Sequence, residues 1–170
     1  MAAPLDPYLQ GLRDRVGQDL LWLPGVTAVV LRDSADDGPE VLLVRRADNG
    51  AWTPVTGIVD PGEDVDAAAV REIREETTLS AVVERVVWVL ALPVTTYPNG
   101  DVCQFLDTTV RCRATGGEAR VGDAESTDVG WFPVADLPVS SPRMRHQIEH
   151  AASGDHAVLF GMDGRRPGGA

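Results

Sequence analysis

The 170-residue sequence predicts an α/β fold in which a mixed β-sheet lies between helices. Two observations lead to this fold class. Several short apolar segments are separated by polar turns, and two or three segments have helical periodicity. In addition, the length is typical of one domain, and 44% of the residues are hydrophobic while 24% are charged. These values exclude a disordered chain, a collagen-like repeat and a disulfide scaffold.

The N-terminal third predicts one helix followed by a hairpin. Four aliphatic residues recur there at helical spacing: Leu9, Leu12, Val16 and Leu20. After an interruption at Pro24 and Gly25, strands are expected over residues 26–32 and 40–46, joined by a polar turn. We therefore expect an amphipathic helix that packs on the domain, and then a pair of strands.

The remaining elements alternate between the two types. Further strands are predicted over residues 52–59, 82–94, 102–113 and 129–132. Pro54 marks an edge or a bulge in the first of these. The clearest helix covers residues 64–77, with Asp64 or Asp66 as its cap. A final helix covers residues 142–152, with Ser140 or Ser141 as its cap and proline in its first turn.

No segment of the sequence is a linker long enough to divide the chain. We expect an N-terminal arm and helix over residues 1–24, one domain over residues 25–162 and a disordered tail over residues 163–170. Cys103 and Cys112 lie nine residues apart in one predicted strand, so they should point to opposite faces and stay reduced.

The charge of the chain limits its partners. The formal net charge is −11, which disfavours a general DNA- or RNA-binding groove. No signal peptide and no membrane-spanning run is visible, so the expected location is the cytoplasm and no membrane partner is expected. A phosphate ligand remains compatible with this charge if cations accompany it.

The most informative segment runs from residue 57 to residue 79, where a loop with two glycines leads into a helix. Glu72, Glu75 and Glu76 are spaced i, i+3 and i+4, so they project from one helical face. Three carboxylates on one face offer an oxygen-rich site suited to Mg²⁺ or Mn²⁺. The alternative for such a run alone is a solvated, highly charged surface helix.

The loop before this helix has its own signals. Gly57 and Gly62 permit positive φ and close approach of the backbone, and a loop carbonyl could complete a metal site. Glu63 precedes Arg71 by eight residues, and an ion pair between them would fix the loop to the helix.

Loop and helix together resemble the Nudix box, in which a glycine and a glutamate precede Arg-Glu-aliphatic-X-Glu-Glu-X-Gly-aliphatic. The matching residues are Gly57, Glu63, Arg71, Glu72, Ile73, Glu75, Glu76 and Leu79. One position departs, because Thr78 stands where the family has glycine. A positive φ is expected there, and a β-branched residue pays about 1–2 kcal/mol for it. The resemblance covers roughly residues 25–138 and implies an α/β/α sandwich with a mixed β-sheet.

The resemblance implies an enzyme that hydrolyses a pyrophosphate bond in a nucleoside diphosphate linked to another group. It implies Glu72, Glu75 and Glu76 as Mg²⁺ or Mn²⁺ ligands, with the carbonyl of Thr56 as a further one. The general base would be Glu72 or Glu125, and Glu125 could equally be an ordinary exposed acid. Catalytic roles thus fall on Glu72, Glu76 and Glu125, while Glu63 and Arg71 orient the box.

Four residues are candidates for substrate contacts. Arg45 and Arg46 could bind phosphate, but adjacent strand residues face opposite sides, so only one can reach the cleft. Trp52 and Tyr97 could stack on a base. Core packing is the alternative for Trp52, and a loop surface position is the alternative for Tyr97. The other tryptophans, Trp22, Trp88 and Trp131, are expected in the core, and the three histidines are expected to be structural or at the surface.

The substrate stays open between an ADP-ribose type and a (d)NTP type. Pro93 and Tyr97 fall near positions that mark two different subgroups, so they discriminate neither. The alternative to an enzyme is a nucleotide-binding sensor without hydrolysis. The resemblance also leaves a homodimer open, with the N-terminal helix as a dimer or packing element.

Overall fold

The computed structural model describes residues 7–34, 38–97 and 99–168. Within these ranges the helices are α1 (Pro7–Val16), α2 (Val65–Thr77) and α3 (Pro142–Ala152). The strands, in chain order, are β1 (Leu21–Ser34), β2 (Gly38–Arg46), β3 (Trp52–Thr53), β4 (Val55–Ile58), β5 (Ser80–Ala91), β6 (Thr95–Thr96), β7 (Val102–Gly116), β8 (Ser126–Pro133) and β9 (Leu159–Phe160).

The strands form one mixed sheet with the central order β3-β2-β1-β7-β5-β9. Strand β1 runs parallel to β7 and antiparallel to β2 and β4. Strand β4 pairs with the first half of β1, where Gly57 lies opposite Val26. The segment that leads into α2 is therefore fixed near the middle of the sheet.

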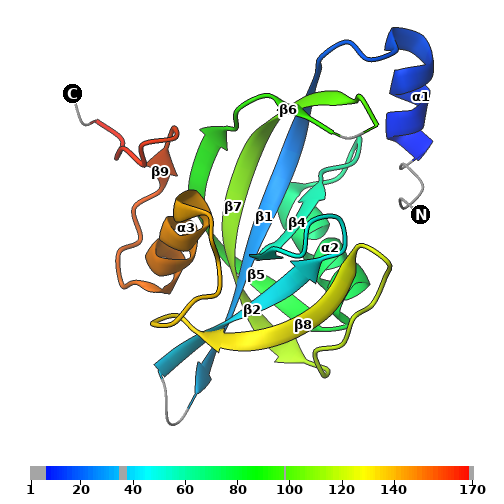
Figure 1. The fold of residues 1–170 in the computed structure, drawn as a ribbon. Helices are drawn as coiled ribbons and strands as arrows, with labels where there is room; N and C mark the ends of the chain where they lie inside the picture. Colours follow the sequence, from blue (N-terminus) through cyan, green and yellow to red (C-terminus); the bar gives the residue numbers. More distant parts are fainter. Residues whose placement is uncertain (1–6, 35–37, 98, 169–170) are drawn as a thin grey trace.

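Helices α2 and α3 cover opposite faces of this sheet (Figure 1). Side chains of β1 alternate between the two cores. Val26 and Ala28 pack under α2, whereas Val29 and Leu31 pack in the core that includes α3. This arrangement confirms the predicted α/β/α sandwich with a mixed sheet. None of the described helices is long and apolar enough to cross a membrane.

The N-terminal helix is shorter than predicted. It ends at Val16 because Gly17 adopts φ +62° and donates its N–H to the carbonyl of Arg13. Strand β1 then begins at Leu21 and continues through Pro24, where an interruption was expected. Proline removes only one donor from the ladder, and the carbonyl of Pro24 still accepts the N–H of Val59.

Helices α2 and α3 follow the predicted ranges, but only α3 has a side-chain hydrogen bond at its N-cap. Ser141 accepts a hydrogen bond from the N–H of Met144 at the start of α3. Asp64 is the N-cap of α2, yet its side chain makes no capping hydrogen bond. The short strands β6 and β9 were not predicted, since two residues carry no periodicity.

Other predictions have mixed outcomes. Trp22 is 54% exposed, so its predicted core position is wrong, whereas Trp88 is 1% exposed. Both cysteines are buried free thiols of β7 and lie in different cores. The division into arm, domain and tail stays a prediction. Within that tail, Arg165 exchanges backbone hydrogen bonds with Phe160. Residues 1–6, 169–170 and parts of two predicted turns, 35–37 and 98, lie outside the described residues.

Candidate active site

The three glutamates of α2 share one side of the helix but differ in exposure. Glu76 is 5% exposed, whereas the side chains of Glu72 and Glu75 are 16% and 55% exposed. Ile73 is fully buried in the core under the helix and turns this side of α2 toward the sheet. The helix thus carries two carboxylates into the protein and leaves the third at the surface.

Glu72 packs directly on the backbone of Gly57 in β4. A Cβ atom at residue 57 would lie 2.1 Å from the Oε1 atom of Glu72 and 2.3 Å from its Cγ. Only glycine permits this contact, because any side chain would displace the carboxylate. Gly62, by contrast, has φ +85°. Both predicted uses of glycine therefore occur, at different positions. Gly57 allows close approach of Glu72 to the backbone, and Gly62 adopts a positive φ.

Burial perturbs both inner carboxylates. Burial raises the pKa of Glu72 to about 7, although the hydrogen bond from Arg71 opposes this shift. Burial also raises the pKa of Glu76 to about 8, and the charges of Glu72 and Asp123 add to the effect. The hydroxyl of Ser126 donates to Oε2 of Glu76 at 3.2 Å and partly offsets it. The site concentrates negative charge that the protein solvates poorly.

Arg71 ties the loop and the helix together. Its Nε and Nη2 atoms each donate to Glu63 at 2.9 Å, and Nη2 also donates to the carbonyl of Ile58 at 3.0 Å. Nη1 donates to Glu72 at 2.8 Å and to Glu75 at 3.3 Å. The expected Glu63–Arg71 pair is present, and this pair lowers the pKa of Glu63. Arg71 thus links the loop, at Ile58 and Glu63, to two of the three glutamates of the helix.

The helix end is closed by the loop after β7. The N–H groups of Arg120 and Gly122 donate to the carbonyls of Thr77 and Glu76. A Cβ at Gly122 would lie 2.0 Å from the carbonyl oxygen of Glu75, so only glycine fits there. Thr78 adopts φ +60°, the left-handed conformation expected of the family glycine. Its hydroxyl donates to the carbonyl of Glu118 at 2.9 Å.

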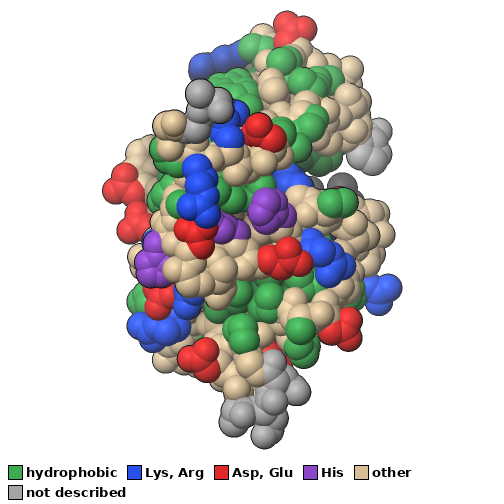
Figure 2. Space-filling model, turned by 90° about the vertical axis from the view of Figure 1, so that its left-hand side faces the viewer, with side chains coloured by type: hydrophobic (Ala, Val, Ile, Leu, Met, Phe, Trp, Pro, Cys, Tyr) green, Lys and Arg blue, Asp and Glu red, His purple; other side chains and the backbone are tan. Residues whose placement is uncertain are grey.

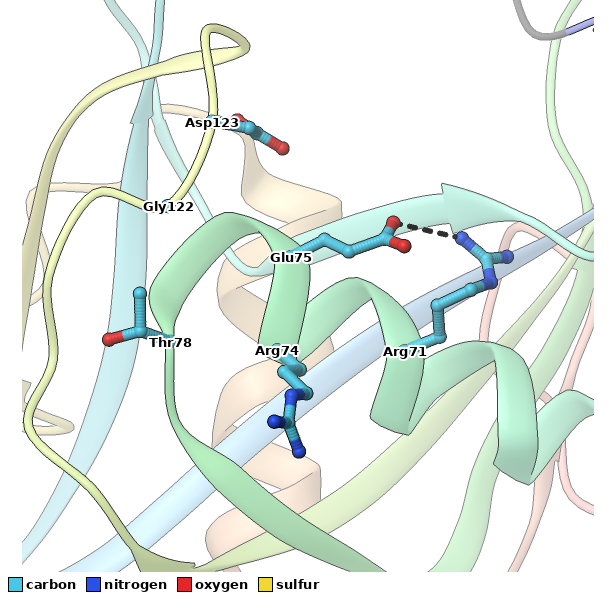
Figure 3. Close-up of a pocket in the computed structure, with 6 residues that line it drawn as sticks. All are labelled: Arg71, Arg74, Glu75, Thr78, Gly122 and Asp123. Atoms are coloured by element: carbon cyan, nitrogen blue, oxygen red, sulfur yellow. Dashed lines mark hydrogen bonds and ion pairs between the residues drawn. The ribbon is translucent and has the colours of Figure 1, made fainter.

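An open pocket of about 700 Å³ lies beside this helix end (Figure 3). It is lined by Arg71, Arg74, Glu75, Thr78, Gly122 and Asp123. Figure 3 shows Glu75 reaching along the helix toward Arg71, while Asp123 projects from the facing loop. The pocket thus adjoins the exposed side of the glutamate cluster.

Glu125 approaches the cluster from the same loop. Burial raises its pKa, and the charges of Asp123 and Asp48 contribute, whereas Arg46 opposes the shift. Its backbone carbonyl accepts the N–H of Ala47 at 2.8 Å, which joins this loop to the end of β2. The loop therefore brings a further carboxylate within electrostatic range of the α2 glutamates.

The two arginines of β2 separate as adjacent strand residues should. Arg46 pairs with Ser126, the residue that donates to Glu76, so it lies on the glutamate side. Arg45 pairs with Trp52 and donates to the carbonyl of Gly50. Of the two predicted phosphate contacts, the structure brings only Arg46 to the cluster.

The predicted base contacts have different positions. Trp52 packs edge-on against Phe132 in the core that includes α3, with ring centroids 4.8 Å apart. For Trp52 the structure therefore shows core packing, which was the alternative to a base contact. Tyr97 is 36% exposed and lies within electrostatic range of Arg46. Thr56 lies on β4 next to Gly57 and opposite Thr27.

The histidines lie outside this site. His146 packs edge-on against Trp88, and the Nε2 atom of His150 is 2.8 Å from the carbonyl oxygen of Ala157. On the face that carries the C-terminal segment, histidine side chains occur among interspersed acidic and basic groups (Figure 2). For these two histidines the contacts agree with the structural role, which was expected as the alternative to a surface position.

The donor set suits a hard divalent cation, because carboxylate oxygens crowd a poorly solvated part of the protein. Across the part of the chain that the structure describes, however, no three His, Cys, Asp or Glu side chains are already arranged to hold a metal ion. Arg71 engages Glu72 and Glu75 instead. Cation binding there would require these carboxylates to exchange Arg71 for the ion.

Sequence reasoning missed four contributors to the site: Asp48, Gly122, Asp123 and Ser126. Glu125 and Ser126 form part of the segment that resembles the family, but nothing in the sequence showed that the hydroxyl would reach Glu76. Such contacts depend on the register between β2 and β8, which a single sequence does not encode in any short pattern.

Comparisons with known proteins agree on one family. The sequence model of the NUDIX domain matches residues 22–152. A Caenorhabditis elegans protein assigned as nudix hydrolase 1 is 34% identical over 122 residues, which is 69% of this chain and 31% of that protein. A Bacillus subtilis protein assigned as an 8-oxo-dGTP diphosphatase is 31% identical over 139 residues, which is 81% of this chain and 85% of that protein.

A solved structure shares the fold. The ADP-ribose pyrophosphatase of Streptococcus suis aligns with a TM-score of 0.61 at 24% identity, over 81% of this chain and 98% of that one. Coverage differs among relatives, since the chain spans about a third of the Caenorhabditis elegans protein but most of the Bacillus subtilis one.

Proposed function

The chain belongs to the NUDIX family, and from that premise we propose that it hydrolyses a pyrophosphate bond in a nucleoside diphosphate linked to a further group, with Mg²⁺ or Mn²⁺ as cofactor. The observation that carries this proposal is the pair of inner carboxylates, the half-buried Glu72 and the buried Glu76. Both have raised pKa values, and further acids face them. Such a cluster costs folding free energy unless cations bind there.

The ligands we propose for the cation are Glu72, Glu75 and Glu76, with the backbone carbonyl of Thr56 as a further one. When bound, a divalent ion offsets phosphate charge and lowers the pKa of a water molecule. Without it, the acidic cleft would repel a pyrophosphate.

The residues of the chain have distinct proposed tasks. Glu63 and Arg71 hold the loop and helix in register, and Gly57 lets Glu72 approach the β4 backbone. A general base must accept the proton of the attacking water, and Glu72 and Glu125 are both candidates. Glu72 is held between Gly57 and Arg71, whereas Glu125 lies on the opposing loop. Arg46, on the glutamate side of β2, is the residue that we propose contacts a phosphate oxygen.

The candidate substrates are nucleotides of the ADP-ribose type and of the (d)NTP type. The Bacillus subtilis relative is assigned to 8-oxo-dGTP, and the Streptococcus suis structure to ADP-ribose. These names support small nucleotides of both the (d)NTP and the ADP-ribose type as candidates. The alternative of a sensor without hydrolysis rests on Thr78. Because Thr78 keeps the left-handed conformation and α2 remains capped, the helix geometry favours the hydrolase.

The test is coupled phosphate release from a nucleotide panel, with Mg²⁺ and with EDTA. The panel contains ADP-ribose, a dinucleoside polyphosphate, a sugar nucleotide, canonical dNTPs and 8-oxo-dGTP. We expect turnover of one class with Mg²⁺ and none with EDTA, and loss of turnover in Glu75→Gln. Equal turnover in EDTA, or unchanged turnover in Glu75→Gln, would show that the proposed metal site is wrong. No turnover with nucleotide binding intact would identify the sensor.

A further inference from the structure

Arg46 and Asp48 form a two-pronged ion pair at the edge of the proposed active site. Nε of Arg46 donates to Oδ1 of Asp48 at 2.9 Å, and Nη2 donates to Oδ2 at 2.7 Å. The loop that carries them is closed by two backbone hydrogen bonds, from Arg46 to Ala51 and from Gly50 to Arg46. The pair is therefore a local feature of this loop and does not hold distant elements together.

The guanidinium of Arg46 lies on the glutamate side of β2, within electrostatic range of Glu76. Its strand partner is Ser126, and the hydroxyl of Ser126 donates to Glu76. The charge of Arg46 also acts on Glu125. The second guanidinium of the site, that of Arg71, is held by carboxylates of the box itself. Arg46 differs because its carboxylate partner comes from outside the box.

We infer that Asp48 occupies the phosphate-binding edge of Arg46 and has to release it when an anionic substrate binds. The inference rests on the proposed function. A carboxylate in two-pronged contact uses the same two N–H donors that would contact two phosphate oxygens. The side chains of Arg46 and Asp48 are 38% and 52% exposed, so solvent screens the pair and it can exchange.

This competition has two consequences for substrate binding. The phosphate must displace a carboxylate before it reaches Arg46, which weakens apparent affinity by the strength of the ion pair. The released Asp48 also adds a negative charge near the incoming phosphate. Asp48 is therefore a specificity-determining residue that opposes binding, although it takes no part in the chemical step.

The experiment compares KM and kcat for wild type and Asp48→Asn with the best substrate of the panel. Exposed ion pairs contribute about 0.2–1 kcal/mol, which corresponds to roughly a 1.4- to 5-fold fall in KM. We expect a fall in that range for Asp48→Asn, with kcat within about twofold of wild type. In an Arg46→Gln background, Asp48→Asn should lower KM less than it does in wild type, because only the charge of Asp48, and no competition for Arg46, remains to be removed.

Asp163→Asn is the matched control. Asp163 pairs with an arginine two positions away, as Asp48 does: Arg165 lies at 3.4 Å, in the exposed segment after β9. It removes the same charge without touching Arg46, so its KM should equal that of wild type. An equal fall in both variants would assign the effect to net charge and overturn the inference. An unchanged or higher KM in Asp48→Asn would also overturn it, because Asp48 would then orient Arg46.

A binding measurement separates this inference from the proposed function. If no nucleotide is hydrolysed, the function is wrong, but calorimetric titration with inorganic pyrophosphate and Mg²⁺ still tests Asp48. Tighter binding by Asp48→Asn than by wild type and Asp163→Asn supports competition at Arg46. Equal binding by all three proteins, or no binding by any of them, overturns it.

Discussion

Asp107 and Glu76 are both almost fully buried, but they lie on opposite faces of the sheet and in opposite surroundings. Asp107 belongs to β7 and is 3% exposed. It accepts hydrogen bonds from the hydroxyls of Thr27 and Thr109 and from the amide of Gln147 on α3. Three neutral donors from three elements thus contact one carboxylate, and the charge of Arg143 on α3 also acts on it.

Glu76 has a different environment. It accepts one side-chain hydrogen bond, from Ser126, and the charges of Glu72 and Asp123 add to the burial that raises its pKa. The comparison shows two uses of a buried acid. Around Asp107 the fold supplies the donors, so the acid joins a helix to the sheet. Around Glu76 the fold supplies further acids, which suits the binding of cations better than it suits stability.

The largest expected effect that would test this contrast is on catalysis. Glu76→Gln should lower kcat by about 10²–10⁴-fold in the presence of Mg²⁺, because it removes a proposed ligand from the reacting centre. Its free energy of unfolding in EDTA should equal or exceed that of wild type, since a crowded charge disappears. Steady-state kinetics and urea denaturation measure the two quantities.

Glu149→Gln is the control, because Glu149 is exposed on α3. It should change neither kcat nor stability. A Glu76→Gln enzyme that keeps full activity but unfolds more easily would mean that Glu76, like Asp107, serves the fold.

The second effect is on stability. Asp107→Ala should lower the free energy of unfolding by about 2–4 kcal/mol, because the donors of Thr27, Thr109 and Gln147 lose their shared acceptor inside the protein. The comparison variant is Asp136→Ala at an exposed turn, for which a change within about 0.5 kcal/mol is expected. Urea denaturation checks both. A loss below about 0.5 kcal/mol in Asp107→Ala would show that water can replace this network.

The third effect is on the pH dependence of the free energy of unfolding, which should differ between Glu63 on the α2 side and Asp107 on the α3 side of the sheet. The pKa of Glu63 is lowered by its hydrogen bond from Arg71, so this pair contributes full stability above the unfolded value of about 4.3. That contribution is lost as the pH falls through the folded pKa. Glu63→Gln should therefore be less stable than wild type at pH 7, and the two should converge toward pH 3.

Asp107 has the opposite sign. Burial raises its pKa, so wild type gains stability relative to Asp107→Asn as the pH falls from 7 toward the unfolded value of about 3.9. Thermal unfolding of both variants from pH 7 to pH 3 measures how their stability relative to wild type changes with pH. If the stability of both variants relative to wild type changed with pH in the same direction, Glu63, which is paired with Arg71, and Asp107, which accepts from neutral donors, would not differ as proposed.

The sequence was sufficient to predict the parts of the site that lie close together along the chain. The spacing of Glu72, Glu75 and Glu76, the Glu63–Arg71 pair and the positive φ at residue 78 all arise within one loop and one helix. Their geometry follows from helix periodicity and from short loop closure. The α/β class was likewise predictable from patterning.

The parts that were not predictable depend on how strands align. Ser126 reaches Glu76 only because of the register between β2 and β8, and Asp107 reaches Gln147 only because of the way α3 packs on the sheet. No local sequence pattern records either arrangement. Trp22 shows the same limit. Trp22 lies on the same face of β1 as Val26, but the sequence does not indicate how far along that face other residues bury the side chains. Its 54% exposure follows from its place near the start of the strand.

The smallest expected effect asks whether strain at the end of α2 belongs to the site. Thr78 is held at φ +60°, which costs a β-branched residue about 1–2 kcal/mol. Thr78→Gly removes this cost but also loses the hydrogen bond to Glu118, about 0.5 kcal/mol at an exposed position, and adds about 0.5 kcal/mol of chain entropy to the unfolded state. A net stabilisation of up to about 1 kcal/mol remains.

Activity should not follow this gain. The N–H groups of Arg120 and Gly122 hold the last carbonyls of α2 whichever residue stands at position 78, so Glu72 and Glu76 keep their places. Thr78→Val, which keeps the strain and loses only the hydroxyl, should be about 0.5–1 kcal/mol less stable than wild type with the same kcat. If Thr78→Gly were more stable but markedly less active, the strained turn at residue 78 would be required for catalysis, together with Glu72 and Glu76.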